Sequence, residues 1–128
     1  MKPLTVYRRV VVEADLEDVE NGKRATAAVL HTLRDRLTRA EGRQAVAQLP
    51  RELKTLWAAS AAPPQPIRMH KALFYERVAS EAGLPSLRAA RAATFAVFGA
   101  LKEQLSPGEA EDVCAQLPKD LKSVWEDA

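Results

Sequence analysis

The stretch Ala47-Gln48-Leu49-Pro50 recurs in this chain as Ala115-Gln116-Leu117-Pro118, at an offset of 68 residues. The match extends in both directions without a gap, so that residues 2–60 align with residues 70–128, and about a third of the aligned positions are identical. Self-similarity over this length indicates an internal duplication. We therefore predict two copies of one helical repeat, joined by a proline-rich linker over residues 61–69.

Each copy is expected to begin with a helix, over 4–14 in the first copy and over 71–82 in the second. Val6, Val10 and Ala14 fall at spacings of four residues and form one apolar stripe. The second copy repeats this spacing. No convincing strand pattern is found elsewhere in the sequence, so helices are expected throughout.

The second predicted helix of each copy runs over 19–37 and over 87–105. Asp18 and Ser86 precede these helices, and their side-chain oxygens can accept a hydrogen bond from a free backbone N–H group of the first turn. The middle of each helix is uncharged on every side, and such a helix must be covered on every side. We therefore expect the two second helices to lie at the centre of the fold.

The third helix of each copy opens with the capping-box pattern, Thr38 to Glu41 and Ser106 to Glu109. In a capping box the hydroxyl and the carboxylate three residues later each accept a hydrogen bond from a backbone N–H of the first turn. The proline of each Gln-Leu-Pro corner ends this helix and opens a short fourth one, which ends at a tryptophan. The corner residues are therefore predicted to be structural: Gln48, Pro50, Trp57, Gln116, Pro118 and Trp125.

These elements predict an all-α protein, a single compact domain over residues 1–128 built as a helical bundle of two pseudo-equivalent four-helix repeats. The length fits one ordinary domain, and a content of 47% hydrophobic and 28% charged residues is typical of a globular protein. The net charge of +2 is far from that of a chain devoted wholly to nucleic acid.

No membrane span or export signal is expected. The longest uncharged stretch, Thr55 to Ile67, has 13 residues and contains three prolines, whereas a transmembrane helix needs about 20 apolar residues. The single cysteine, Cys114, excludes an internal disulfide and multi-cysteine metal sites. A cytoplasmic location is therefore the expectation.

Three stretches together resemble a known family: Ala28 to Leu37 in the second helix, the corner Ala47 to Leu53, and Glu109 to Pro118 in the second copy. They are similar to the bacterial family catalogued as domain of unknown function 2267, and the resemblance covers essentially the whole chain. It implies an all-helical, cytoplasmic bacterial protein. It implies no catalytic or binding residues, because the family carries no established activity.

The two copies differ most in charge. Residues 1–62 carry eleven Lys and Arg against eight Asp and Glu, whereas residues 63–128 carry eight against nine, and Arg43 aligns with Glu111. A candidate patch for phosphates or for an acidic protein partner consists of Arg34, Arg36, Arg39, Arg43, Arg51 and Lys54. Because no aromatic residue is interleaved with these cations, unstacked bases have no evident platform, and an ordinary solvated face is the alternative.

His31 and Cys114 are the remaining candidates for chemistry. His31 aligns with Gly99, so we expect a buried, hydrogen-bonded, neutral histidine with the glycine opposite it. Cys114 aligns with Val46, which predicts a buried and inert thiol. The histidines lack metal-ligand spacing and the glycines form no phosphate-binding loop, so the sequence predicts no catalytic residue, metal or cofactor.

The sequence therefore predicts a small non-enzymatic protein, an interaction or scaffold module that binds a protein partner or itself. Two alternatives stay open. One is a nucleic-acid-associated module that uses the arginine-rich face of the first repeat. The other is a helical bundle that binds a small molecule or a metal through His31 in a cavity between the second helices.

Overall fold

The computed structural model describes residues 2–128, which fold into eight α-helices and contain no strand. The helices are α1 (Pro3–Ala14), α2 (Val19–Arg36), α3 (Arg39–Ala47), α4 (Arg51–Trp57), α5 (Lys71–Ala82), α6 (Leu87–Gln104), α7 (Pro107–Ala115) and α8 (Lys119–Asp127). The all-α prediction is confirmed, and the helices begin and end within two residues of the predicted bounds. Across residues 2–128, no helix combines the length and the apolarity that a bilayer crossing demands.

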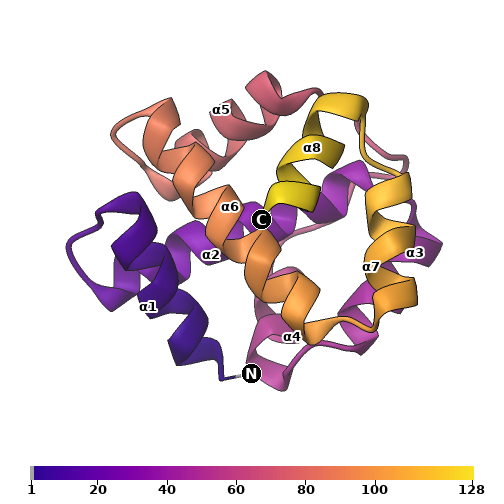
Figure 1. The fold of residues 1–128 in the computed structure, drawn as a ribbon, viewed down its shortest axis with the longest axis horizontal. Helices are drawn as coiled ribbons and strands as arrows, with labels where there is room; N and C mark the ends of the chain where they lie inside the picture. The colour runs from indigo at the N-terminus through magenta and orange to yellow at the C-terminus, as the bar shows by residue number, and fades with distance from the viewer. Residues whose placement is uncertain (1) are drawn as a thin grey trace.

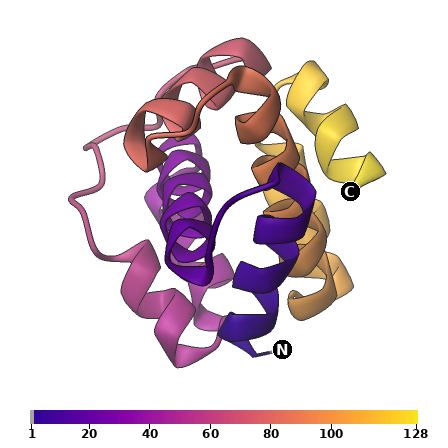
Figure 2. The same cartoon turned by 90° about the vertical axis from the view of Figure 1, so that its left-hand side faces the viewer.

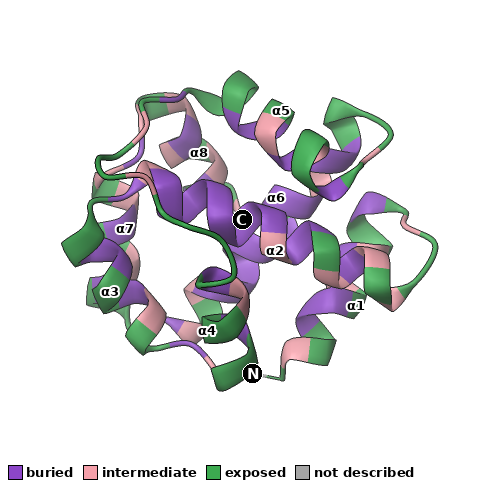
Figure 3. Ribbon diagram, turned by 180° about the vertical axis from the view of Figure 1, so that it is seen from behind, coloured by how far each residue is buried: buried purple, intermediate pink, exposed green. Residues whose placement is uncertain are grey.

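The two longest helices, α2 and α6, run through the middle of the molecule and contact each other (Figures 1 and 2). The first helix of each half, α1 or α5, packs against both of them. Seen from behind, the buried residues run along α2 and α6 (Figure 3). The uncharged middles of these helices thus account for their central place, because each needs apolar neighbours on every side.

Local capping starts the central helices. Asp18 Oδ1 accepts a hydrogen bond from Asn21 N at 2.9 Å, and Ser86 Oγ accepts one from Ala89 N at 3.1 Å. Each contact satisfies one of the backbone N–H groups that have no partner inside the helix. These side-chain caps define where α2 and α6 begin.

The proline corners bring two large side chains into the core. Pro50 and Pro118 are the residues that precede the first turns of α4 and α8. Trp57 at the end of α4 is 6% exposed, and Trp125 in α8 is 3% exposed. The last helix of each half is therefore anchored by a buried indole ring.

The corner glutamines join the two halves of the chain. Gln48 Oε1 accepts a hydrogen bond from Ser106 N at 2.7 Å, and Gln116 Oε1 accepts one from Thr38 N at 2.9 Å. Each amide nitrogen also donates to the hydroxyl of the same residue, at 3.3 and 3.2 Å. These reciprocal contacts hold α3 and α7 side by side at one end of the molecule (Figures 1 and 3).

The capping boxes of α3 and α7 are consequently only half formed. Thr38 Oγ1 accepts from Glu41 N and Ser106 Oγ accepts from Glu109 N, each at 3.2 Å. The backbone N–H groups of Thr38 and Ser106 are already bound by the glutamines of the opposite half. The prediction that the Glu41 and Glu109 carboxylates complete the boxes is therefore wrong.

Gly22 and Gly42 predict opposite effects of the same substitution. A Cβ at Gly22 would lie 2.5 Å from the backbone oxygen of Tyr7, so Gly22→Ala must displace α1 from α2 and should lower the free energy of unfolding by about 1–3 kcal/mol. A Cβ at Gly42 would make an ordinary 3.6 Å contact with the Trp57 ring. Gly42→Ala should therefore raise the free energy of unfolding by about 0.5–1 kcal/mol. Urea unfolding measures both, and effects of the same sign would contradict this helix packing.

Candidate functional site

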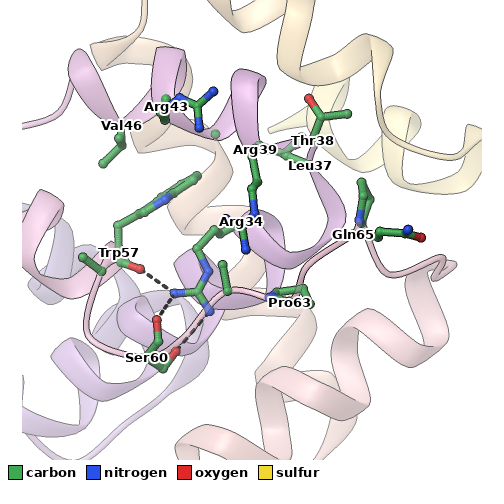
Figure 4. A pocket seen from close by; sticks show the side chains of 14 residues that line it. Arg34, Leu37, Thr38, Arg39, Arg43, Val46, Trp57, Ser60, Pro63 and Gln65 are labelled. Carbon is green, nitrogen blue, oxygen red and sulfur yellow. Dashed lines mark hydrogen bonds between the residues drawn. The ribbon is translucent and has the colours of Figure 1, made fainter.

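An open groove lies between α3, the end of α4 and the linker, and has a volume of about 410 Å³. Its apolar part is formed by Leu37, Val46 and Trp57. Figure 4 shows the Arg39 and Arg43 side chains reaching from α3 on one side of it, with linker residues on the other side. The name first groove is used below for the space that Leu37, Arg39, Arg43, Val46, Trp57 and Pro63 line.

Arg34 also borders the first groove, but its guanidinium is already bound within the fold. The Nη1 atom donates to Trp57 O at 2.7 Å and to Ser60 O at 2.8 Å (Figure 4), and the Nη2 atom donates to Asp35 Oδ1 at 2.9 Å. Arg34 is only 8% exposed. It therefore caps the carboxyl end of α4 and does not offer a free charge to a ligand.

Lys102, at the position aligned with Arg34, has the same role in the second half. Its Nζ atom donates to Trp125 O at 2.8 Å and to Ala128 O at 2.7 Å. A cation near the last carbonyls of a helix interacts favourably with the negative end of the helix dipole. The recurrence of a cation at these aligned positions thus follows from the fold.

Of the other cations of the predicted patch, two line the first groove. Arg39 and Arg43 are exposed and line the first groove. Arg51 and Lys54 are exposed on α4 and do not line it, and Arg36 is half-buried. The structure therefore brings together Arg39 and Arg43 as the exposed cations of the first groove.

A second groove occupies the matching place between α7 and α8, with a volume of about 500 Å³. At the position of Arg43 in the first groove, the second groove has Glu111. At the position of Ala58 it has Glu126. The second groove also contains Lys122. The two grooves share a tryptophan but differ in charge, so they cannot favour the same ligand.

Cys114 lies along the second groove and is half-buried. The prediction of a buried thiol is therefore wrong. Burial, followed by the nearby carboxylate of Glu126, raises the pKa of the Cys114 thiol. A thiol that holds its proton more firmly is a weaker nucleophile at neutral pH, which agrees with the expected lack of reactivity.

His31 is 7% exposed and has an acceptor at each ring nitrogen. Its Nδ1 lies 2.7 Å from Glu81 Oε2, and its Nε2 contacts the backbone oxygen of Leu56. No ring nitrogen is left for a metal or a substrate. The expectation that Gly99 lies opposite the ring is wrong. A Cβ at Gly99 would lie 2.7 Å from a guanidinium nitrogen of Arg9, so the glycine makes room for Arg9 and not for His31.

The freed carboxylates of Glu41 and Glu109 lie together where α3 packs against α7. These residues are 7% and 8% exposed, and the Oε1 atom of each is buried without a hydrogen-bond partner. Asp112, which is exposed, joins them from α7, and one oxygen from each of the three carboxylates lies within 4.8 Å of the others. The name carboxylate cluster is used below for Glu41, Glu109 and Asp112.

Burial raises the pKa of Glu41 from its ordinary value of 4.5 to about 7, and the neighbouring carboxyl groups of Glu109 and Asp112 act in the same direction. The folded state therefore binds this proton more tightly than the unfolded chain does. A proton on Glu41 stabilises the fold at low pH, and that contribution is lost as the pH rises through about 7. Ionisation of Glu41 in this cluster therefore lowers the stability of the fold relative to the protonated form.

A family model described as "Uncharacterized conserved protein (DUF2267)" matches residues 5–127. The chain belongs to this family, as the resemblance of its helix and corner segments indicated. No curated protein matches the chain. The family description assigns no activity.

Proposed function

We propose that the protein is a non-enzymatic interaction module that binds an acidic, extended segment of a partner protein in the first groove. The observation that carries this proposal is the pairing of two free cations with an apolar surface. Arg39 and Arg43 are exposed, and neither forms an ion pair with another residue in the range 2–128. Guanidinium groups bind carboxylates in a bidentate geometry, which favours an acidic ligand.

The walls of the first groove support an extended segment. The half-buried Val46 and the small exposed edge of Trp57 offer apolar contact beside the two arginines, a combination typical of protein interfaces. The opposite wall includes Pro63 and Pro66 of the linker. Prolines limit the conformations of this wall before binding, so less entropy is lost when the ligand is held.

The second groove supplies an internal contrast. It keeps the tryptophan but has Glu111 in place of Arg43, and a carboxylate there repels an acidic ligand. The tryptophan is thus common to both grooves, while the pair of exposed arginines belongs to the first groove alone. We infer that the arginines serve a ligand and are not needed to form the helix corner.

Binding is tested with a fluorescein-labelled, unstructured peptide in which aspartates and glutamates flank a leucine, and with a matched peptide that has lysines in place of the acids. The acidic peptide should raise the fluorescence anisotropy on addition of protein, and less so at high salt. Arg39→Glu/Arg43→Glu should weaken its binding at least about tenfold, because charge-assisted hydrogen bonds contribute about 1.5–3 kcal/mol each.

The matched control is Arg51→Glu/Lys54→Glu, which changes the net charge equally but lies outside the first groove. It should leave binding within about twofold, because exposed charges at a distance are screened by salt. Equal losses in the two variants would remove the groove proposal. Binding to duplex DNA or to RNA that both variants lose, with no binding of the acidic peptide, would instead support the nucleic-acid alternative.

A further inference from the structure

The carboxylate cluster is not part of the first groove and has no role in the proposed binding function. Glutamates at the third position of a helix ordinarily accept a hydrogen bond from the N-cap backbone N–H. Here Gln116 and Gln48 bind those N–H groups, so Glu41 and Glu109 are released toward each other. Two carboxyl groups are thereby placed close together in a nearly buried position, with no lysine or arginine to pair with them.

The lack of donors is specific to particular atoms. Oε1 of Glu41 and Oε1 of Glu109 are both buried and without a hydrogen-bond partner. No lysine or arginine in residues 2–128 forms an ion pair with any of the three carboxylates. An unpaired buried acceptor is costly, and an unpaired buried charge is more costly still. Either a proton held by one of the carboxyl groups or a cation that several oxygens share relieves this cost.

We propose that Glu41, Glu109 and Asp112 form a binding site for a hard divalent cation, with Ca²⁺ as the ion whose size fits best. The cluster offers only carboxylate oxygens, which are the ligands that such ions prefer. Two ligands on opposite sides of Ca²⁺ are separated by about 4.6–5.2 Å, and the three oxygens all lie within 4.8 Å of one another.

Asp112 gives the site an entrance. It is exposed, whereas the two glutamates are buried, so an ion can arrive with part of its water shell and exchange some waters for the inner carboxylates. Water completes the remaining coordination positions, as is usual for ions held by few protein ligands. The ion would bridge α3 and α7 and reinforce the contacts that the corner glutamines already make.

The test is thermal unfolding of chelator-treated protein at pH 8, with CaCl₂, MgCl₂ or MnCl₂ added, together with calorimetric titration of the same ions. With three protein ligands we expect a Kd of about 10⁻⁴–10⁻³ M for Ca²⁺. At about 10 mM Ca²⁺ the midpoint temperature of wild type should then rise by about 5–10 °C. Mg²⁺ should give a smaller rise, because it requires shorter bonds and sheds water reluctantly.

Glu109→Gln should abolish the rise with Ca²⁺, since it removes one ligand charge. This variant should fold at least as well as wild type without the ion, because it ends the repulsion with Glu41. The control is Glu111→Gln, which removes a charge from an exposed residue of the same helix outside the cluster, and it should keep the full response. An unchanged wild-type midpoint at 10 mM Ca²⁺, or an equal response in the two variants, would overturn the proposal.

Discussion

Trp125→Ala is expected to lower the free energy of unfolding by about 3–5 kcal/mol. The indole is 3% exposed, and its ring lies 5.0 Å from that of Phe98, centroid to centroid, in an edge-to-face arrangement. Truncation therefore removes apolar burial, leaves a cavity beside α6 and ends an aromatic contact worth about 0.5–1.5 kcal/mol. Domains of this size are stable by about 5–15 kcal/mol, so the loss is a large part of the total.

Chemical unfolding followed by circular dichroism measures this loss without relying on tryptophan fluorescence. Trp57→Ala is the matched comparison, because Trp57 is aligned with Trp125 and likewise borders a groove, but stacks on no aromatic ring described in residues 2–128. Its loss should fall at the lower end of the same range. If Trp125→Ala changed the free energy of unfolding by less than about 1 kcal/mol, the anchoring role of α8 would be wrong.

The helices could be predicted from the sequence because their signals are local. Asp18 and Ser86 start the central helices through their own side chains, and Pro50 and Pro118 mark the corners by backbone geometry alone. Apolar stripes at spacings of four residues then indicate which faces are buried. None of these features depends on the rest of the chain, so each could be recognised before the fold was known.

The partners of polar groups could not be predicted in the same way. The capping box is a local rule, and it failed for Glu41 because Gln116 arrives from the other half of the chain and binds the same backbone N–H. A glutamate that caps its own helix has no reason to lie near Glu109 and Asp112, so the carboxylate cluster could not be predicted either. In the same way, Gly99 indicated free space, but which side chain fills that space, here Arg9, depends on how α1 packs on α6.

Arg34 is a different case, since the sequence did contain a usable signal. The sequence places Arg34 in one patch with the other cations of the first half. Its aligned residue in the second half is Lys102, so a cation is present at this position in both halves, whereas Arg43 aligns with Glu111. Recurrence in both copies favours a structural role, and both side chains bind the carbonyls at the end of the last helix of their half. A cation that recurs at aligned positions, such as Arg34 and Lys102, is therefore better explained by the fold than one that does not, such as Arg43.

Removal of the Asp35 side chain should reveal how much the buried end of Arg34 depends on a counter-charge. Asp35 Oδ1 accepts hydrogen bonds from Arg34 Nε and Nη2 at 3.0 and 2.9 Å, and its Oδ2 lies 3.3 Å from Arg77 Nη2. The Arg34 and Asp35 side chains are 8% and 10% exposed. Asp35→Ala leaves a guanidinium in the protein interior without its carboxylate, and we expect the free energy of unfolding to fall by about 3–5 kcal/mol.

Glu103→Ala is the control, because Glu103 is aligned with Asp35 and pairs with Arg9 as Asp35 pairs with Arg77. Here the side chains are 66% and 39% exposed, and an exposed pair contributes only about 0.2–1 kcal/mol. Added salt should shrink the effect of Glu103→Ala and leave that of Asp35→Ala almost unchanged, since screening requires solvent access. Equal losses at the two positions would mean that burial does not set the strength of these pairs, and the structural role assigned to Arg34 would then be wrong.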